Sequence, residues 1–78
     1  MEMMEKSINL RGLKCPLPAL KTRKVLSGLA AGDIIVVECT DPLSAIDIPN
    51  LLRETGDVLE GQREDGASIA FSIRKAGG

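Results

Sequence analysis

The sequence contains no histidine, tryptophan or tyrosine, and only two of its 78 residues are cysteine. A Ser/His or Cys/His nucleophilic pair needs an imidazole, and a structural zinc site usually needs four cysteine or histidine ligands, so both kinds of site are excluded. Cys15 and Cys39 are too far apart in the sequence to form a CxxC redox pair. Any chemistry must therefore proceed without a histidine base, and we expect it to use one thiol.

Long apolar runs and a strong charge imbalance are also missing. No run approaches the roughly 20 residues of a membrane span, and the start, MEMMEKSINL, lacks the apolar stretch of a signal peptide. Ten basic and eleven acidic residues give a net charge of −1, which argues against a large basic surface for nucleic acid. We expect a cytoplasmic protein that binds neither membranes nor nucleic acid directly, and nothing in the sequence predicts a cofactor or a metal.

The chain is short enough to form one hydrophobic core, and we expect a single domain over residues 1–78. Hydrophobic periodicity and turn signals predict the element order β-α-β-α-β-β. The strands are expected at 6–10, 33–40, 57–64 and 67–74, with helices from Pro16 to about Leu29 and from Asp41 to about Thr55. Right-handed crossovers then place both helices on one face of a four-stranded mixed sheet, which is a two-layer α/β sandwich.

Two details of this prediction concern the helices and the central strand. The first helix is amphipathic, with Lys21 and Lys24 on its outer face. In the second, Asp41 is the expected cap, and Pro49 predicts a kink or a restart with Asp47 as a second cap. If Glu38 faces solvent, the alternation in DIIVVECT turns Ile35, Val37 and Cys39 toward the helices.

The stretch GLKCPLPAL places Cys15 where a loop containing Gly12 gives way to the first helix. With Cys15 as N-cap, Pro16 at N1 and Pro18 at N3, a thiolate would face the positive end of the helix. Helix N-termini and nearby cations, here Lys14, Arg11 and Lys21, lower a cysteine pKa from about 8.5 to between about 3.5 and 7.5. Such a thiolate is suited to accepting a sulfur atom by thiol exchange. The alternative is a small structural hydrophobe at position 15.

Three segments carry a resemblance to a known family. The segment LRGLKCPLPALKTRKVL resembles the CPxP signature and following helix of the TusA family of small sulfur carriers, which includes SirA and YedF. The segment TDPLSAIDIP resembles the DP-x-x-x-x-DIP segment of that family. The ending IRKAGG resembles its last strand and glycine tail. The resemblance covers the chain from about Ile8 to Gly78. Many relatives have a further cysteine after the DIP motif, where this chain reads Pro49-Asn50-Leu51-Leu52.

The resemblance implies the fold of the C-terminal domain of translation initiation factor three. It also implies a sulfurtransferase activity in which Cys15 takes sulfur as a persulfide from a cysteine desulfurase or other donor and passes it to a downstream relay protein. In well-known members the sulfur reaches the 2-thio group of the tRNA wobble uridine, and other members serve molybdenum-cofactor assembly or sulfur oxidation. We expect such a carrier to be a monomer.

Several other residues have two interpretations. The basic residues close to the thiol form either a partner-binding surface or an ordinary solvated face; they are Arg11, Lys14, Lys21, Arg23 and Lys24. Cys39 is either a second reactive thiol or core packing, and Asp41 and Asp47 are explained more simply as caps than as a catalytic pair. Gly77-Gly78 is either a frayed tail or the site of a C-terminal thiocarboxylate, as in ubiquitin-like carriers. A different class of function, a non-catalytic interaction or RNA-binding module, would predict exposed aromatic residues.

Overall fold

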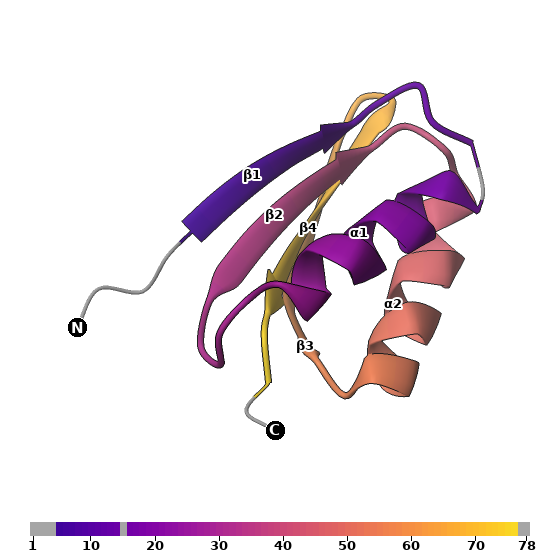
Figure 1. Ribbon diagram of the computed structural model, residues 1–78. Coiled ribbons are helices and arrows are strands. Elements are labelled where there is room, and N and C mark those ends of the chain that lie inside the picture. The colour runs from indigo at the N-terminus through magenta and orange to yellow at the C-terminus, as the bar shows by residue number, and fades with distance from the viewer. Residues whose placement is uncertain (1–4, 15, 77–78) are drawn as a thin grey trace.

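The computed structural model describes residues 5–14 and 16–76 and has the expected order of elements (Figure 1). The strands are β1 (Glu5–Leu10), β2 (Ile34–Cys39), β3 (Val58–Asp65) and β4 (Ser68–Arg74), and the helices are α1 (Leu17–Ser27) and α2 (Ser44–Thr55). The strands form one sheet in the order β1-β2-β4-β3, in which β1 and β2 are parallel and the other pairs are antiparallel. Both helices cover the same face of this mixed sheet, so the predicted two-layer sandwich is confirmed.

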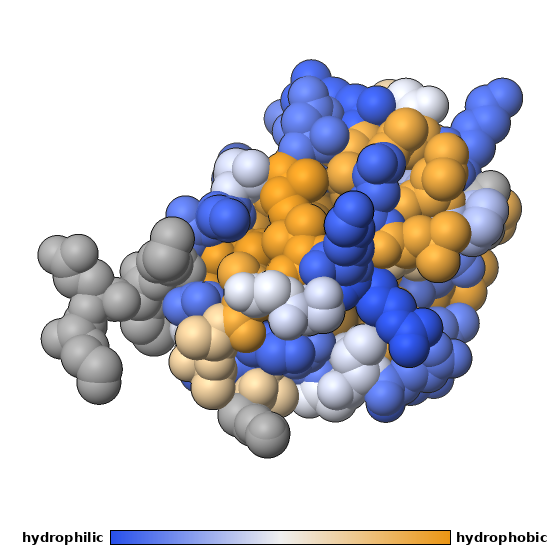
Figure 2. Space-filling view, in the orientation of Figure 1, coloured by the Kyte–Doolittle hydropathy of each residue, from blue (hydrophilic) through white to orange (hydrophobic). Residues whose placement is uncertain are grey.

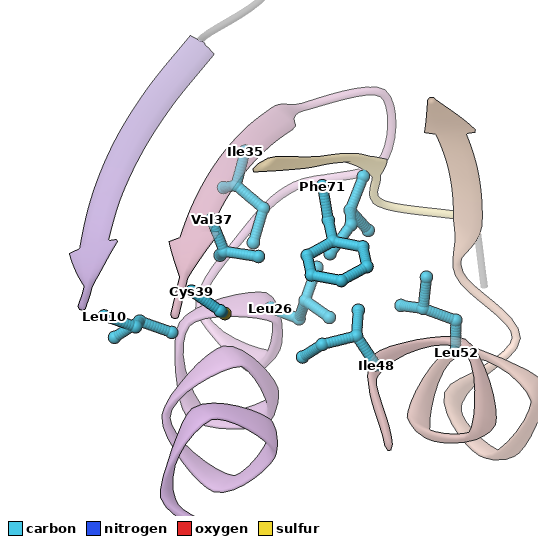
Figure 3. Packing of buried hydrophobic residues seen from close by; sticks show 9 residues of the cluster. Leu10, Leu26, Ile35, Val37, Cys39, Ile48, Leu52 and Phe71 are labelled. Atoms are coloured by element: carbon cyan, nitrogen blue, oxygen red, sulfur yellow. The ribbon is translucent and has the colours of Figure 1, made fainter. Parts of the chain in front are cut away.

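The core lies between the sheet and the two helices. Its sheet side includes Ile35, Val37 and Cys39 of β2, as the alternation predicted, and all three are fully buried. Val37 pairs with Phe71 of β4, and the aromatic ring lies among the aliphatic side chains (Figure 3). The helices contribute Leu26, Ile48 and Leu52. With one aromatic residue in the chain, packing of branched aliphatic side chains around Phe71 stabilises the fold.

The start of α1 differs from the prediction by one residue. The Leu20 N–H donates to the Pro16 carbonyl at 3.1 Å, which is the first intrahelical hydrogen bond, so Pro16 is the N-cap and the helix begins at Leu17. Pro18 lies at the second helical position and is buried, rather than at the third. The expectation that Cys15 is the N-cap is therefore wrong, and Cys15 itself lies outside the described residues.

The second helix also begins later than predicted. Asp41 caps a turn that precedes it: the Leu43 N–H donates to Asp41 Oδ1 at 2.9 Å, and the helix begins at Ser44. No restart occurs at Pro49, and Asp47 lies within the first turn instead of capping a second helix. The missing proline N–H removes one hydrogen bond, but burial of Ile48, Leu51 and Leu52 keeps α2 continuous.

The last two strands form the predicted hairpin, with Gly66 at φ +60° in its turn. Just before β3, the Asp57 side chain is only 1% exposed and its Oδ1 accepts a hydrogen bond from the Ala76 N–H at 2.9 Å. This contact ties the segment after β4 to the end of α2. Among the described residues, neither helix is long and apolar enough to cross a membrane.

Candidate functional site

The candidate site is the segment that joins β1 to α1. Its middle residue, Cys15, lies outside the described residues, so the site is defined by the backbone on either side. The Leu17 N–H donates to the Lys14 carbonyl at 2.9 Å, which closes a turn directly before the helix. Lys14 and Pro16 are both exposed. Position 15 therefore falls between an exposed cationic residue and the N-cap of an 11-residue helix.

The loop before this turn is fastened to the end of β2. The Gly12 N–H donates to Thr40 Oγ1 at 2.9 Å, with Gly12 at φ +82°, a conformation that glycine adopts with little strain. The Leu13 N–H donates to the Leu10 carbonyl at 3.3 Å. Gly12 thus shapes the loop and holds it beside the adjacent strand.

A cleft of about 500 Å³ lies between this loop and the segment that leads into α2. Residues 12–14 form one wall and residues 40–43 form the other. Leu13, Pro42 and Leu43 make part of the lining apolar, while Lys14 and Asp41 place one charge of each sign at it. The cleft therefore opens directly beside the residue that precedes Cys15.

The five predicted partner-binding residues are all exposed, and two of them lie beside acidic residues. The Arg11 guanidinium forms an ion pair with Glu38 of β2. Arg23 lines a separate groove between the two helices, together with Asp47 and Glu54. Lys14, Lys21 and Lys24 are the exposed lysines of the loop and of α1.

Sequence reasoning missed an apolar surface at the same end of the molecule. Four large apolar side chains near the starts of the two helices are exposed: Leu17 (44%), Leu20 (55%), Leu43 (52%) and Ile46 (59%). In Figure 2, hydrophobic side chains gather over the end at which α1 begins. The sequence did contain one sign of this surface. Leu17 and Leu20 fall outside the helical stripe of Ala19, Thr22 and Leu26 that packs toward the core.

Cys39 is the one cysteine among the described residues, and it belongs to the core. It is fully buried on β2 and points into the hydrophobic cluster (Figure 3). Burial raises the pKa of the Cys39 thiol; a hydrogen bond with Ser44 opposes this, and the Asp41 and Glu38 charges add to the increase. The core-packing interpretation of Cys39 agrees with this environment.

Over residues 5–14 and 16–76, no three His, Cys, Asp or Glu side chains gather closely enough to hold a metal ion. What the arrangement offers is an exposed loop, a cation next to position 15, the positive end of a helix dipole and an adjoining cleft.

Comparison with known proteins gives a consistent result. The profile of the family described as sulfurtransferase TusA matches residues 6–75. The chain is 33% identical over 72 residues to the sulfur carrier protein TusA of Allochromatium vinosum, covering 92% of this chain and 95% of that protein. It is 34% identical over 77 residues to the putative sulfur carrier protein YrkF of Bacillus subtilis, covering 96% of this chain but only 42% of that longer one.

A solved structure has the same fold. The SirA-like protein from Desulfitobacterium hafniense superposes with a TM-score of 0.80 at 24% identity, covering 91% of this chain and 97% of that one. The profile match spans the whole sandwich, from β1 to the residue after β4. The chain therefore belongs to the TusA sulfurtransferase family.

Proposed function

We propose that this protein is a sulfur carrier that holds sulfur as a persulfide on Cys15. The single observation that carries the proposal is the state of the other thiol. The chain has two cysteines, and Cys39 is fully buried in the core with a raised pKa. A thiol in that state is protonated at neutral pH and inaccessible to a partner, so Cys15 is left to carry the sulfur.

The transfer needs only a thiolate and access to it. The Cys15 thiolate attacks the outer sulfur of a donor's persulfide, the donor's S–S bond breaks, and the donor leaves as a thiolate with the bonding electron pair. The transferred sulfur keeps its proton, so atoms and charge balance and no external oxidant or reductant is consumed. Thiol exchange of this kind requires no histidine base and no oxyanion hole, in agreement with the composition. In this proposal Lys14 and the N-terminus of α1 stabilise the attacking thiolate.

The proposed partners are a cysteine desulfurase or other donor and a downstream relay protein that accepts the sulfur. Relatives named sulfur carriers support this role. We propose that the sulfur serves tRNA 2-thiouridine formation or related sulfur trafficking. We further propose that the protein acts in the cytoplasm as a monomer. Pro16, Pro18 and Gly12 shape the segment around Cys15 in this account.

A thiocarboxylate on Gly77-Gly78 is the rival mechanism, and both glycines lie outside the described residues. Arg74, at the end of β4, pairs with Ile34 at the start of β2, whereas the cleft lies beyond Cys39 at the other end of β2. β2 has six residues from one of those ends to the other, which corresponds to about 17 Å. The end of β4 and the cleft therefore lie at opposite ends of β2.

The test is an intact-mass measurement after incubation with a cysteine desulfurase and cysteine. We expect a gain of one sulfur atom that a reductant removes, that is absent in Cys15→Ser and that remains in Cys39→Ser. No gain in any variant would contradict the proposal. A gain that disappears only when Gly77-Gly78 is deleted would support the thiocarboxylate instead.

The alternative of an RNA-binding or regulatory module has little support. Recognition of single-stranded RNA on an open sheet relies on exposed aromatic side chains that stack on bases. The only aromatic residue of this chain is Phe71, and it is buried on the face that the helices cover. The uncovered face of the sheet therefore lacks the stacking platform that this function needs.

A further inference from the structure

Contacts of two kinds tie the loop before position 15 to a neighbouring strand. The Gly12 N–H donates to Thr40 Oγ1 at 2.9 Å, and the Arg11 guanidinium forms the ion pair with Glu38. Figure 1 shows the loop after β1 running beside the segment after β2, where Thr40 lies. The ion pair joins two side chains that are both in contact with water, so it contributes little to the position of the backbone. The Thr40 hydroxyl holds the main chain of the loop directly.

Thr40 is itself held in place, because it directly follows the central strand. Cys39, the residue before it, is fully buried and pairs with Leu10 at the end of β1. Threonine is branched at Cβ, which restricts rotation about χ1 and keeps the hydroxyl in few positions. The acceptor for the Gly12 N–H is therefore fixed to the core through the residue that precedes it.

Both ends of the segment that contains position 15 are fastened. At one end, Thr40 holds Gly12 in its left-handed backbone conformation, and the Leu13 side chain packs against the core cluster. At the other end, the Leu17 N–H donates to the Lys14 carbonyl at 2.9 Å, where α1 begins. Release of Gly12 would therefore change where position 15 lies relative to the N-terminus of the helix.

We propose that Thr40 is a positioning residue for Cys15. By holding Gly12, its hydroxyl keeps the thiol at the N-terminus of α1 and beside Lys14. This inference rests on the proposed role of Cys15. The hydroxyl touches neither the donor nor the transferred sulfur and acts through the backbone of the loop. A thiol held at a helix N-terminus beside a cation has a lowered pKa, and a thiol that leaves this place returns toward a pKa of about 8.5. Thr40 therefore sets the fraction of Cys15 that is thiolate at neutral pH.

The first experiment measures the rate at which iodoacetamide alkylates Cys15 as a function of pH. Thr40→Val keeps the shape of the side chain but removes the acceptor, whereas Thr40→Ser keeps the hydroxyl. One hydrogen bond shifts a conformational equilibrium by about three- to tenfold, so we expect Thr40→Val to react about three- to tenfold more slowly at neutral pH, with a higher Cys15 pKa. At high pH, where the thiol is ionised in both proteins, Thr40→Val should no longer be slower. Thr40→Ser should restore the parent rate and the parent pKa.

Thr55→Val is the matched control. Thr55 is half-buried at the opposite end of α2 from the cleft, and its hydroxyl also accepts a backbone hydrogen bond, from the Asp57 N–H at 3.4 Å. We expect the Cys15 pKa of this control to equal that of the parent. An equal rise in Thr55→Val or in Thr40→Ser would mean that lost stability, and not the lost hydroxyl, moves the thiol, and it would overturn the inference. A parent pKa at about 8.5 would also overturn it, because the loop would then hold the thiol to no effect.

The second experiment follows exchange of the Gly12 amide hydrogen with solvent by NMR, which tests the hydrogen bond without any thiol chemistry. We expect this exchange to be about three- to tenfold faster in Thr40→Val than in the parent, and unchanged in Thr40→Ser. Equal exchange in all three proteins would mean that the hydroxyl does not hold the loop. Faster exchange together with an unchanged Cys15 pKa would mean that the loop moves without moving the thiol. Either result would overturn the inference.

Loading by inorganic polysulfide separates failure of this inference from failure of the proposed function. The Cys15 thiolate attacks a sulfur of the polysulfide, and the shorter polysulfide leaves with the bonding electron pair, so this reaction also depends on the thiolate fraction. We expect Thr40→Val to load more slowly than the parent at neutral pH and no more slowly at high pH. Equal loading of the two at neutral pH would overturn the role of Thr40 and leave the carrier role standing. If the Cys15 pKa differs as expected but neither polysulfide nor a cysteine desulfurase loads the parent, the carrier role fails and the positioning role of Thr40 stands.

Discussion

The burial of Cys39 makes a quantitative prediction for the reactivity of the two thiols. Its side chain is fully buried on the central strand β2, so a reagent reaches the sulfur only when the core opens. A stability of about 0.05–0.15 kcal/mol per residue gives a 78-residue domain about 4–12 kcal/mol. At about 1.4 kcal/mol for each factor of ten, alkylation of Cys39 should be at least about a thousandfold slower than that of an accessible thiol. The raised pKa of Cys39 lowers its thiolate fraction and slows the reaction further.

The assay is alkylation with iodoacetamide at neutral pH, followed by intact mass over time. We expect one equivalent to add rapidly to the folded protein, and a second equivalent to add only slowly or after denaturation in urea. Cys15→Ser should show only the slow event, and Cys39→Ser only the rapid one. Comparable rates for the two thiols in the folded parent would refute the argument, because Cys39 would then be an accessible site for sulfur.

Three further predictions concern stability, measured by urea unfolding with Val58→Ala as an exposed control that should change it little. Phe71→Ala should lower the free energy of unfolding by about 3–5 kcal/mol, since it opens a cavity at the centre of the core; a loss as small as that of the control would contradict this packing. Asp57→Ala should cost about 1–3 kcal/mol, because the Ala76 N–H loses its acceptor, and an unchanged stability would mean that this contact does not hold the last segment. The raised pKa of Cys39 means that its thiol ionises at a lower pH in the unfolded chain than in the folded one, so the free energy of unfolding of the parent should fall as pH rises above about 8.5. Cys39→Ala should lack this fall. Identical dependence of stability on pH in the two proteins would contradict the prediction.

Most of the fold was predictable because local signals agreed with one another. The alternation around Ile35 and Val37 fixed which side of β2 faces the helices, and Asp65-Gly66 marked the hairpin. The helix starts were less predictable. Proline at positions 16 and 18 indicates a first turn, but the same pair fits an N-cap at residue 15 or 16, and only the hydrogen bond to the Pro16 carbonyl decides between them.

At Pro49, packing of the core outweighs the tendency of proline to interrupt a helix. The missing proline N–H predicts a kink or a restart. Ile48 and Leu52 on either side of Pro49 are buried in the core, and a restart would move them out of it. At the candidate site, the sequence predicted Cys15 and the cations near it. The exposed apolar side chains at the helix starts were missed: the pattern of α1 placed Leu20 outside the core stripe, but the exposure of Ile46 depends on how the two helices pack.

The central claim is that Cys15 carries the sulfur, and locating that sulfur within the chain tests it most directly. The protein is loaded with a cysteine desulfurase and cysteine, the remaining thiols are blocked, and the proteolytic fragments are weighed before and after reduction. The account predicts one additional sulfur, removed by reduction, on the fragment that contains Cys15, and none on the fragment that contains Cys39. Sulfur on the Cys39 fragment, or on the fragment ending at Gly78, would contradict it.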